Sequence, residues 1–308
     1  MDNKQVIQYL KEKKEFKDKD INIIKPLTGG ITNDNYLIEI DSKKYVLRLP
    51  TPSSKKMIDR DTEYKNNTIG CNLNLNAPCI YFNCENGIKI AEYIEKSDID
   101  VEEFKENKEA IEKIAKTIKK LHSSNILMEN DFDIFEKLKL YEDITIENKG
   151  WFPEDYREVK EKVLEIYNNL EREYGFSKKI CHNDALAENF ILSKDNKVYL
   201  IDWEYGGNND QAWDLASFLI ESELSKENME IFINSYLDKE KLDKELIEKL
   251  KFFTIYQDFL WSVWTLVKLS SGEEGYEEYF TKRYNRTKRN LDIYFKSKDK
   301  GLEYYLKG

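Results

Sequence analysis

The stretch that most constrains how this chain can fold runs from Ile180 to Gly207 and reads ICHNDALAENFILSKDNKVYLIDWEYGG. Two short apolar runs in it are separated by the turn-forming sequence Lys-Asp-Asn-Lys, a pattern that predicts a β-hairpin. Asn189 precedes the first run and Asp202 follows the second, so the hairpin brings both side chains to the same end of the strand pair. Asp184 lies on the loop just before it. The sequence therefore predicts three oxygen-bearing side chains facing one small volume.

Oxygen ligands of this kind suit Mg²⁺, which binds carboxylates and amide oxygens and keeps several waters. Phosphoryl transfer asks for little covalent chemistry from the protein. It uses a metal to neutralise the phosphates and a carboxylate to orient and deprotonate the attacking hydroxyl. We therefore predict that Asp184 is the catalytic base and that Asn189 and Asp202 are the metal ligands. The alternative is an ordinary surface turn rich in Asp and Asn.

The motif His182-x-Asp184-x-x-x-x-Asn189, followed by Ile201-Asp202-Trp203-Glu204, resembles the catalytic and metal-binding loops of the protein-kinase-like phosphotransferases. The forms HND and DWEY are similar to the choline/ethanolamine kinase and aminoglycoside phosphotransferase branch, whereas protein kinases carry HRD and DFG. The second motif follows the hairpin at the expected distance, which disfavours a chance match. The resemblance implies an α+β, two-lobed kinase-like fold that uses ATP and Mg²⁺.

The composition, 40% hydrophobic and 35% charged residues, is typical of a soluble globular chain. The formal net charge of −10 argues against nucleic acid as a partner, because phosphate backbones bind basic faces. The longest apolar stretch, Phe259 to Val267, is too short to cross a membrane, and the first residues lack the apolar segment of a signal peptide. Four cysteines without a CxxC pair indicate free thiols and a cytoplasmic location.

The 308 residues suffice for two lobes. We predict an N-terminal nucleotide-binding lobe over residues 1–94, made of a five-stranded antiparallel sheet with one helix, and a large, mainly helical catalytic and substrate-binding lobe over 95–308. The predicted strands are residues 21–27, 36–40, 44–49, 78–82 and 87–94, with a charged helix over 1–20 and another helix from residue 58. The mixed-charge tail over 282–300 is expected to be a solvated helix or a solvated chain end.

A glycine-containing turn between the first two strands is expected to cover the nucleotide. Adjacent glycines allow a backbone to approach phosphates closely, although such a pair is first of all typical of a hairpin turn. The resemblance places the family's GG[IM][ST]N loop here. The cofactor-binding residues that it implies are Gly29, Gly30, Thr32, Asn33 and Asn35.

Four further residues are expected to bind the nucleotide. Arg48 ends the third strand, where related kinases carry a cation that contacts phosphates, and Glu63 in the following helix would pair with it. The alternatives are a solvated strand end and an ordinary exposed helix acid. The resemblance places the hinge at the end of the fifth strand, where Glu92 and Ile94 would face the adenine with backbone groups.

Three residues around the catalytic stretch are expected to be structural. His122 closes an apolar helix face, as a satisfied core histidine does. The resemblance implies that His182 packs beneath the metal loop and that Asp214 holds the catalytic loop from behind; Asp214 could also be a simple acid at a helix N-terminus. Cys181 and His182 point opposite ways in an extended segment, which excludes a thiol protease pair.

Trp261 and Trp264 lie three residues apart on a predicted helix and so share a face. Such pairs usually belong to a core. However, the helix resembles the FWxxW helix of choline kinases, and Glu204 and Tyr205 follow the metal aspartate as in their DFEY motif. The resemblance implies an aromatic box in which these four residues hold a quaternary ammonium by cation–π contacts.

We therefore expect ATP-dependent phosphotransfer to choline, giving phosphocholine. One departure concerns Ala185-Leu186-Ala187, where eukaryotic choline kinases usually carry a Gln, so the shorter bacterial choline kinases are more similar. The alternatives are a kinase for ethanolamine, thiamine, an aminoglycoside or a sugar, and a catalytically silent binding protein on the same fold. The Trp pair favours a quaternary cation over an aminoglycoside, and the intact acids disfavour the silent protein.

Overall fold

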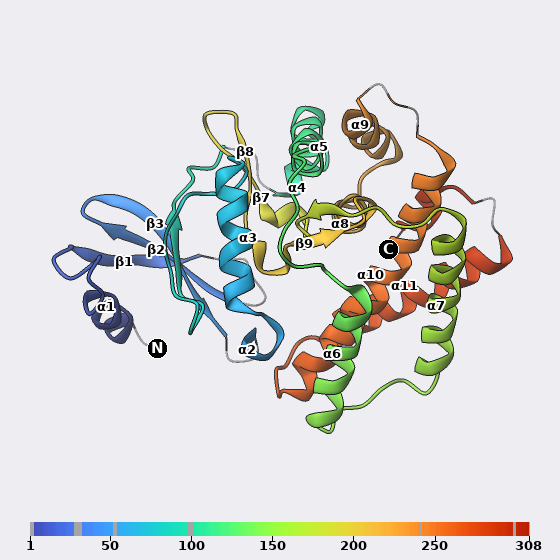
Figure 1. Cartoon of the computed structure of the whole chain (residues 1–308), viewed down its shortest axis with the longest axis horizontal. Helices are drawn as coiled ribbons and strands as arrows, with labels where there is room; N and C mark the ends of the chain where they lie inside the picture. Colours follow the sequence, from blue (N-terminus) through green and yellow to red (C-terminus); the bar gives the residue numbers. More distant parts are fainter. Residues whose placement is uncertain are drawn as a thin grey trace.

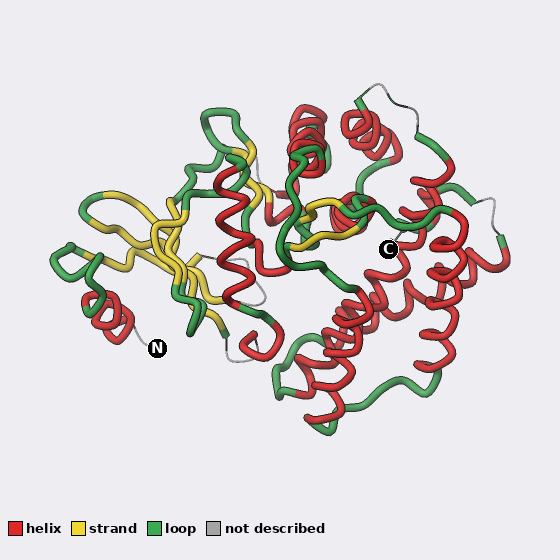
Figure 2. The backbone as a smooth tube through the Cα atoms, viewed as in Figure 1, coloured by secondary structure: helices red, strands yellow, loops and turns green. Residues whose placement is uncertain are grey.

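The computed structural model describes residues 3–27, 33–51, 54–97, 101–238, 240, 242–297 and 300–307. A sheet with three helices forms the N-terminal part, and helices dominate the C-terminal part (Figures 1 and 2). The predicted α+β, two-lobed architecture is confirmed. We propose the lobe boundary at 94/95, because the backbone of Glu95 and Ser97 bonds to the hairpin around Leu192 rather than to the N-terminal sheet.

The N-terminal sheet has the order β1-β2-β3-β5-β4, with every neighbouring pair antiparallel. Its strands are β1 (Ile21–Leu27), β2 (Asn33–Ile40), β3 (Lys43–Pro50), β4 (Cys79–Phe82) and β5 (Lys89–Glu92). Asp41 and Ser42 join β2 to β3 with φ angles of 48° and 64°. Two left-handed residues give the twist that a two-residue hairpin needs. The five predicted strands are all present.

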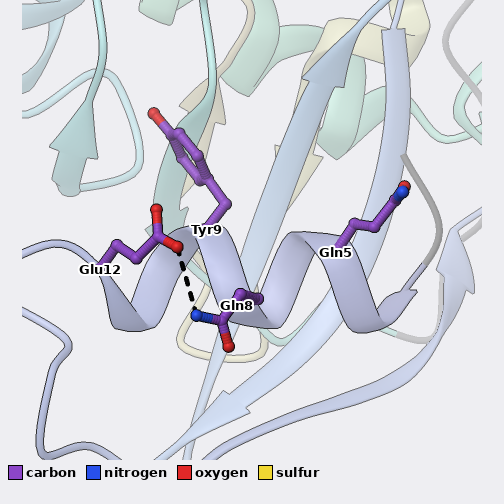
Figure 3. Close-up of a pocket in the computed structure, with 4 residues that line it drawn as sticks. All are labelled: Gln5, Gln8, Tyr9 and Glu12. Atoms are coloured by element: carbon purple, nitrogen blue, oxygen red, sulfur yellow. Dashed lines mark hydrogen bonds between the residues drawn. The ribbon is translucent and has the colours of Figure 1, made fainter.

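Helix α1 (Asn3–Lys11) packs on this sheet through Val6 and Leu10, and Phe16 follows in the same apolar cluster. The predicted helix over residues 1–20 is therefore too long, because the chain turns after Lys11 to bring Phe16 onto the sheet. A shallow hollow on the outer side of α1 is lined by Gln5, Gln8, Tyr9 and Glu12 (Figure 3), and it contains none of the predicted site residues.

Helix α3 (Arg60–Asn72) lies between the sheet and the C-terminal part (Figure 1), after the short α2 (Ser54–Met57). Its N-cap is Asp59, whose carboxylate accepts a hydrogen bond of 2.8 Å from the Thr62 N–H. Such a cap satisfies one of the free N–H groups of the first turn. The cap therefore starts the helix at Arg60 and places Glu63 in its first turn.

Helix α10 (Lys244–Ser270) forms the centre of the C-terminal part. It is buried over most of its length, because apolar residues occur all round it. The remaining helices are α4 (Val101–Phe104), α5 (Lys108–His122), α6 (Ile134–Glu147), α7 (Tyr156–Glu173), α8 (Ala212–Ser222), α9 (Lys226–Leu237) and α11 (Glu277–Lys296), with a short 3₁₀ turn at Leu302–Tyr304. None of the helices within the described ranges is both long and apolar enough to span a membrane.

Helix α11 corrects the expectation of a solvated tail. It packs along α10 and buries Arg283, Arg286 and Asn290. The charged residues that suggested a solvated helix include two arginines that bind the buried Asp258 of α10. The mixed charges indicated a solvated helix because the sequence pattern does not show that two of the arginines pair with a buried carboxylate.

Two small strand pairs carry the catalytic stretch. Strand β6 (Lys179–Cys181) pairs with β9 (Gly207–Asn209), and β7 (Phe190–Leu192) pairs with β8 (Val198–Leu200), both antiparallel. Short 3₁₀ turns lie at Ala187–Asn189 and Trp203–Tyr205. The hairpin predicted from the two apolar runs is confirmed.

We predict that Gly70→Ala destabilises the protein by about 1–3 kcal/mol, the usual cost of overpacking. A Cβ at Gly70 of α3 would lie 2.6 Å from Cε2 of Trp203, which is fully buried and donates to Leu200 O. The free energy of unfolding from denaturant titration measures the effect. The control Asn72→Ala, at an exposed position of the same helix, should change it by less than about 0.5 kcal/mol. Equal effects would show that α3 does not pack closely on Trp203.

Candidate active site

The hairpin joins the three predicted residues Asp184, Asn189 and Asp202. The Ile201 N–H donates to Asn189 O at 2.9 Å, so Asn189 and Asp202 flank the same end of the strand pair. The side-chain amide nitrogen of Asn189 donates to the backbone oxygen of Asp184 at 2.7 Å and to its carboxylate at 3.0 Å. Since the nitrogen is committed to Asp184, the amide oxygen of Asn189 is the atom left for a metal.

The catalytic loop is fixed from behind by Asp214 of α8. Its carboxylate accepts the N–H groups of His182 at 2.8 Å and of Asn183 at 2.7 Å. His182 Nε2 donates to Ile201 O at 2.9 Å, and burial lowers the pKa of this histidine. Asp202 has a left-handed backbone, with φ and ψ both 67°. The structural roles predicted for His182 and Asp214 fit these contacts.

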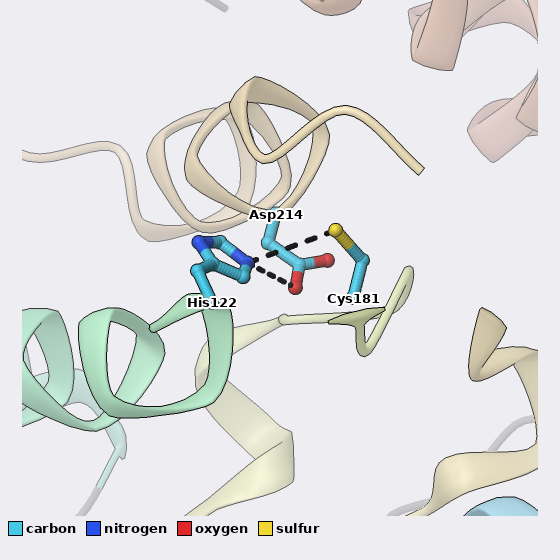
Figure 4. Close-up of side chains that lie close together, drawn as sticks. All are labelled: His122, Cys181 and Asp214. Carbon is cyan, nitrogen blue, oxygen red and sulfur yellow. Dashed lines mark hydrogen bonds and ion pairs between the residues drawn. The ribbon is translucent and has the colours of Figure 1, made fainter. Parts of the chain in front are cut away.

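His122, Cys181 and Asp214 form a buried cluster directly behind this loop (Figure 4). His122 Nε2 lies 3.1 Å from Asp214 and 3.7 Å from the Cys181 sulfur, and its Nδ1 lies 2.9 Å from the Tyr236 hydroxyl. Burial raises the pKa of the Cys181 thiol well above its ordinary value, which keeps the sulfur protonated. His122 is the satisfied core histidine that the sequence predicts.

Arg48 and Glu63 form a buried, two-pronged ion pair. The two guanidinium nitrogens lie 2.5 and 2.9 Å from the two carboxylate oxygens, and Arg48 is 3% exposed. The predicted pairing is confirmed, and neither residue is solvated. Although burial opposes ionisation, Arg48 and then Lys89 lower the pKa of Glu63 to about 2.

Arg48 also reaches the catalytic stretch. One of its nitrogens lies 3.3 Å from Asp202 and 3.7 Å from Glu204. Arg60 joins the same group, at 2.6 Å from Glu63 and 3.3 Å from Glu204. Sequence reasoning missed Arg60, although its position three residues before Glu63 on a helix is a signal for an ion pair.

Glu204 lies on this ionic side of the site. Asn33 Nδ2 donates to its carboxylate at 3.2 Å. Burial and the charge of Asp202 raise the pKa of Glu204 to about 7, against the opposing effect of Arg48. A direct role for Glu204 toward a substrate cation stays a prediction, since its carboxylate already contacts Arg60 and Asn33.

The nucleotide-side residues are only partly described. Gly29, Gly30 and Thr32 lie outside the described residues. Asn35 of β2 lies opposite Arg48 of β3. Glu92 ends β5 and its N–H donates to Pro78 O at 2.8 Å, while Ile94 follows in the connection to the C-terminal part. Roles for these residues in nucleotide binding stay predictions.

The polar atoms beside Asp202 suit a nucleotide and its metal. Asn33 Oδ1 and Arg48 Nε are buried atoms that have no hydrogen-bond partner among the described residues. Carboxylate oxygens of Glu63, Asp202 and Glu204 lie within 4.8 Å of one another. Hard oxygen atoms in such proximity fit Mg²⁺, and of the three acids Asp202 is the most exposed, at 29%.

The surroundings of Asp184 change the pKa of its half-buried carboxyl group. Burial, and then the negative charges of Asp202 and Glu204, raise its pKa well above the ordinary value. Glu221 at the end of α8 adds to the effect. A raised pKa makes the carboxylate a stronger proton acceptor. Sequence reasoning missed Glu221, which no motif marks.

The predicted tryptophans belong to a chain of edge-to-face rings. The ring centroids of Tyr205 and Trp261 are 5.5 Å apart, those of Trp261 and Trp264 6.4 Å, and those of Trp264 with Tyr276 and Tyr279 6.0 and 6.5 Å. We call these five residues the aromatic cluster. Trp261 is 8% exposed and Trp264 5%, which fits either a core or the wall of a closed site.

Two lysine ammonium groups already lie near these rings. Lys268 Nζ is 5.3 Å from the ring centre of Trp264, and Lys137 Nζ is 5.8 Å from that of Tyr205. Burial lowers the pKa of Lys137. The faces of these rings thus attract cations, and the ring of Trp264 already interacts with the ammonium group of Lys268.

Comparisons with known proteins agree with this geometry. The sequence profile of the family described as choline/ethanolamine kinase matches residues 24–288. The chain is 29% identical to Protein LicA of Haemophilus influenzae over 269 residues, covering 86% of this chain and 78% of that protein. The crystal structure of choline kinase LicA from Streptococcus pneumoniae has a TM-score of 0.79 and 31% identity, covering 94% of this chain and 100% of that one. A LicA structure in complex with AMP gives a TM-score of 0.79 and 30% identity, with 94% and 98% covered.

We predict that Glu63→Gln costs most stability near neutral pH and less as the pH falls. The pKa of Glu63 is lowered from 4.5 to about 2, so its ion pairs contribute stability above pH 4.5 that is lost as the pH falls toward 2. The contribution changes by up to about 1.4 kcal/mol per pH unit in that window. Denaturant titrations of wild type and variant between pH 7 and 3 measure the gap. Asp61→Asn, an exposed acid of the same helix, should follow the wild-type curve; a constant gap for Glu63→Gln would contradict the assignment.

Proposed function

Because the chain belongs to the choline/ethanolamine kinase family, we propose that it transfers the γ-phosphoryl group of ATP to the hydroxyl of choline. The products are phosphocholine and ADP. The observation that carries the proposal is the convergence of Asp184, Asn189 and Asp202 beside a buried Arg48–Glu63 pair. The similarity to pneumococcal choline kinase LicA along most of the chain supports choline as the substrate.

Asp184 is the proposed catalytic base. It orients the hydroxyl of the substrate and accepts its proton while the bond from that oxygen to the γ-phosphorus forms. The bond between the γ-phosphorus and the oxygen of the β-phosphate breaks, and ADP leaves. The hydrogen bond from Asn189 holds the carboxylate of Asp184 in place, and the raised pKa of Asp184 favours proton acceptance.

The amide oxygen of Asn189 and the carboxylate of Asp202 would hold Mg²⁺, which neutralises phosphate charge when bound. Arg48, oriented by Glu63, contacts the nucleotide phosphates. Asn33 and Asn35 of β2 help to cover them, and the same role is proposed for Gly29, Gly30 and Thr32, which lie outside the described residues. The backbone at Glu92 and Ile94 faces the adenine. Use of ATP fits the cytoplasmic location that the sequence predicts.

The aromatic cluster is the proposed site for the substrate ammonium. A quaternary ammonium donates no hydrogen bond and is held by aromatic faces, each worth on the order of 0.5–2 kcal/mol. Glu204, next to Tyr205, stays the proposed negative charge near the ammonium, and Glu221, whose side chain is 26% exposed, is a second one that raises the pKa of both Asp184 and Tyr279. Arg283 donates to both Glu221 and the Tyr279 hydroxyl, which places Glu221 beside the rings, where the ammonium of a bound amino alcohol would be. Tyr205 and Trp261 form the wall nearest the metal loop.

We predict that choline supports the highest kcat/KM in a coupled assay with choline, ethanolamine, thiamine and kanamycin. Phosphocholine should accumulate in step with ADP. Asp184→Asn should lower kcat by on the order of 10²–10⁴ with little change in nucleotide affinity, the usual effect of losing a general base. Wild-type turnover in Asp184→Asn would remove this residue from the mechanism, and a clear preference for kanamycin or thiamine would overturn the substrate assignment.

We predict that Trp261→Phe raises the KM for choline several-fold while kcat and Tm stay close to wild type. Phenylalanine keeps most of the buried apolar surface, but its ring attracts a cation less than indole does. Trp264→Phe should act more weakly, because Lys268 already lies against that ring. Steady-state kinetics and thermal unfolding measure the two effects.

The matched control is Phe259→Leu, a fully buried ring on the same helix that stacks on Tyr156. It should lower Tm and leave the KM for choline near wild type. If Trp261→Phe behaves like this control, both tryptophans belong to the core. Ethanolamine, whose ammonium donates hydrogen bonds, should suffer less from Trp261→Phe than choline does.

A further inference from the structure

Helix α11 sends two arginines to one buried acid, Asp258 of α10. Arg283 lies 2.9 Å from the Asp258 carboxylate, and Arg286 lies 2.6 Å from each of its oxygens. Asp258 is fully buried, and the two arginines are 3% and 5% exposed. A buried carboxylate needs such partners, because an unpaired charge in the core is strongly destabilising.

The two arginines differ in what else they contact. The second terminal nitrogen of Arg283 binds the carboxylate of Glu221 on α8 and donates to the hydroxyl of Tyr279 at 2.8 Å. Its guanidinium carbon also lies 4.8 Å from the ring centre of Tyr279. Arg283 thus joins the core acid to two groups of the substrate side, Glu221 and Tyr279.

The charges in this network pair off in a specific way. Arg286 forms a two-pronged pair with Asp258, which leaves the charge of Arg283 to balance Glu221. Although Glu221 is partly exposed beside the aromatic cluster, the negative charge of its carboxylate is therefore already balanced by Arg283. Arg283 also covers Tyr279, the ring that contacts Trp264. A substrate ammonium bound at the aromatic cluster would contact ring faces and a Glu221 carboxylate that is already paired with Arg283.

We propose that Arg283 is a positioning residue that sets the preference of the site for quaternary over primary ammonium groups. By binding the Glu221 carboxylate, Arg283 leaves the substrate ammonium without a free hydrogen-bond acceptor. By binding Tyr279, it keeps that ring against Trp264. The inference rests on the proposed function, since it concerns which amino alcohol that same site prefers.

The physical reason lies in the hydrogen bonds that each substrate makes. A quaternary ammonium such as choline has no N–H group, so an occupied carboxylate costs it nothing and the aromatic faces hold it. A primary ammonium such as ethanolamine has three N–H donors and gains most from a carboxylate with free lone pairs. Releasing Glu221 from Arg283 therefore helps the primary ammonium, and loosening Tyr279 harms the quaternary one.

The test compares kcat/KM for choline with kcat/KM for ethanolamine. In Arg283→Gln the choline-to-ethanolamine ratio should fall roughly tenfold, the size expected when a cation–π contact is exchanged for a charge-assisted hydrogen bond. The change should appear in the KM values, with kcat for choline affected less. An unchanged or increased ratio would overturn the proposal.

Arg286→Lys is the matched control. It replaces the two-pronged pair with Asp258 by a single ammonium, but it keeps a positive charge for Asp258 and so leaves Arg283 in contact with Glu221 and Tyr279. Its Tm should fall as in Arg283→Gln, while the substrate ratio stays within about twofold of wild type. An equal shift of the ratio in both variants would mean that α11 acts only by stabilising the fold.

Two further variants keep the test decisive. Arg283→Lys retains the positive charge for Asp258, but one ammonium cannot reach Asp258, Glu221 and Tyr279 together, so the ratio should fall in the same direction even if the Gln variant does not fold. Adding Glu221→Gln to Arg283→Gln removes the freed carboxylate and should restore part of the ratio; no recovery would show that Arg283 does not act through Glu221. If wild type phosphorylates neither amino alcohol, the proposed function itself is wrong, which is a separate result.

Discussion

The Arg48–Glu63 ion pair connects the three parts of the molecule that a phosphotransferase must hold together. Arg48 comes from the sheet, Glu63 from α3, and the same guanidinium reaches Asp202 in the catalytic stretch. Buried ion pairs contribute little net stability, because desolvation offsets most of the attraction. Their effect here is geometric. With Arg60 and Lys89 the group contains three cations and three acids, so each side chain is confined by partners of opposite charge.

A second set of buried contacts fixes the chemistry relative to this ionic group. Asp214 holds the backbone of the catalytic loop, and His182 ties that loop to the strand that ends before Asp202. On the other side, α10 carries Asp258, Trp261 and Trp264 within two turns, so the buried charge network and the aromatic cluster share one rigid support. The proposed phosphate side and the proposed cation side therefore meet at Asp184. Such a division suits a small substrate with a hydroxyl at one end and an ammonium at the other.

The sequence was most informative where the pattern is local. The hairpin follows from two apolar runs and a turn, and it alone brings Asn189 to Asp202. The pairing of Arg48 with Glu63 was also predictable, but only through the family resemblance. Arg283 and Asp258 are 25 residues apart, and Glu221 is 62 residues from Arg283, so no periodicity links them. The same limit explains why the tail was expected to be solvated and why the contact of Glu204 with Arg60 was not foreseen.

The most direct test of this account is a structure of the protein with Mg²⁺, a non-hydrolysable ATP analogue and choline. The account predicts that the choline hydroxyl lies within about 3 Å of the Asp184 carboxylate, in line with the γ-phosphorus. The trimethylammonium group should contact Tyr205 and Trp261, with Asn189 and Asp202 on the metal. Choline bound away from the aromatic cluster, or a metal held without Asp202, would contradict the account.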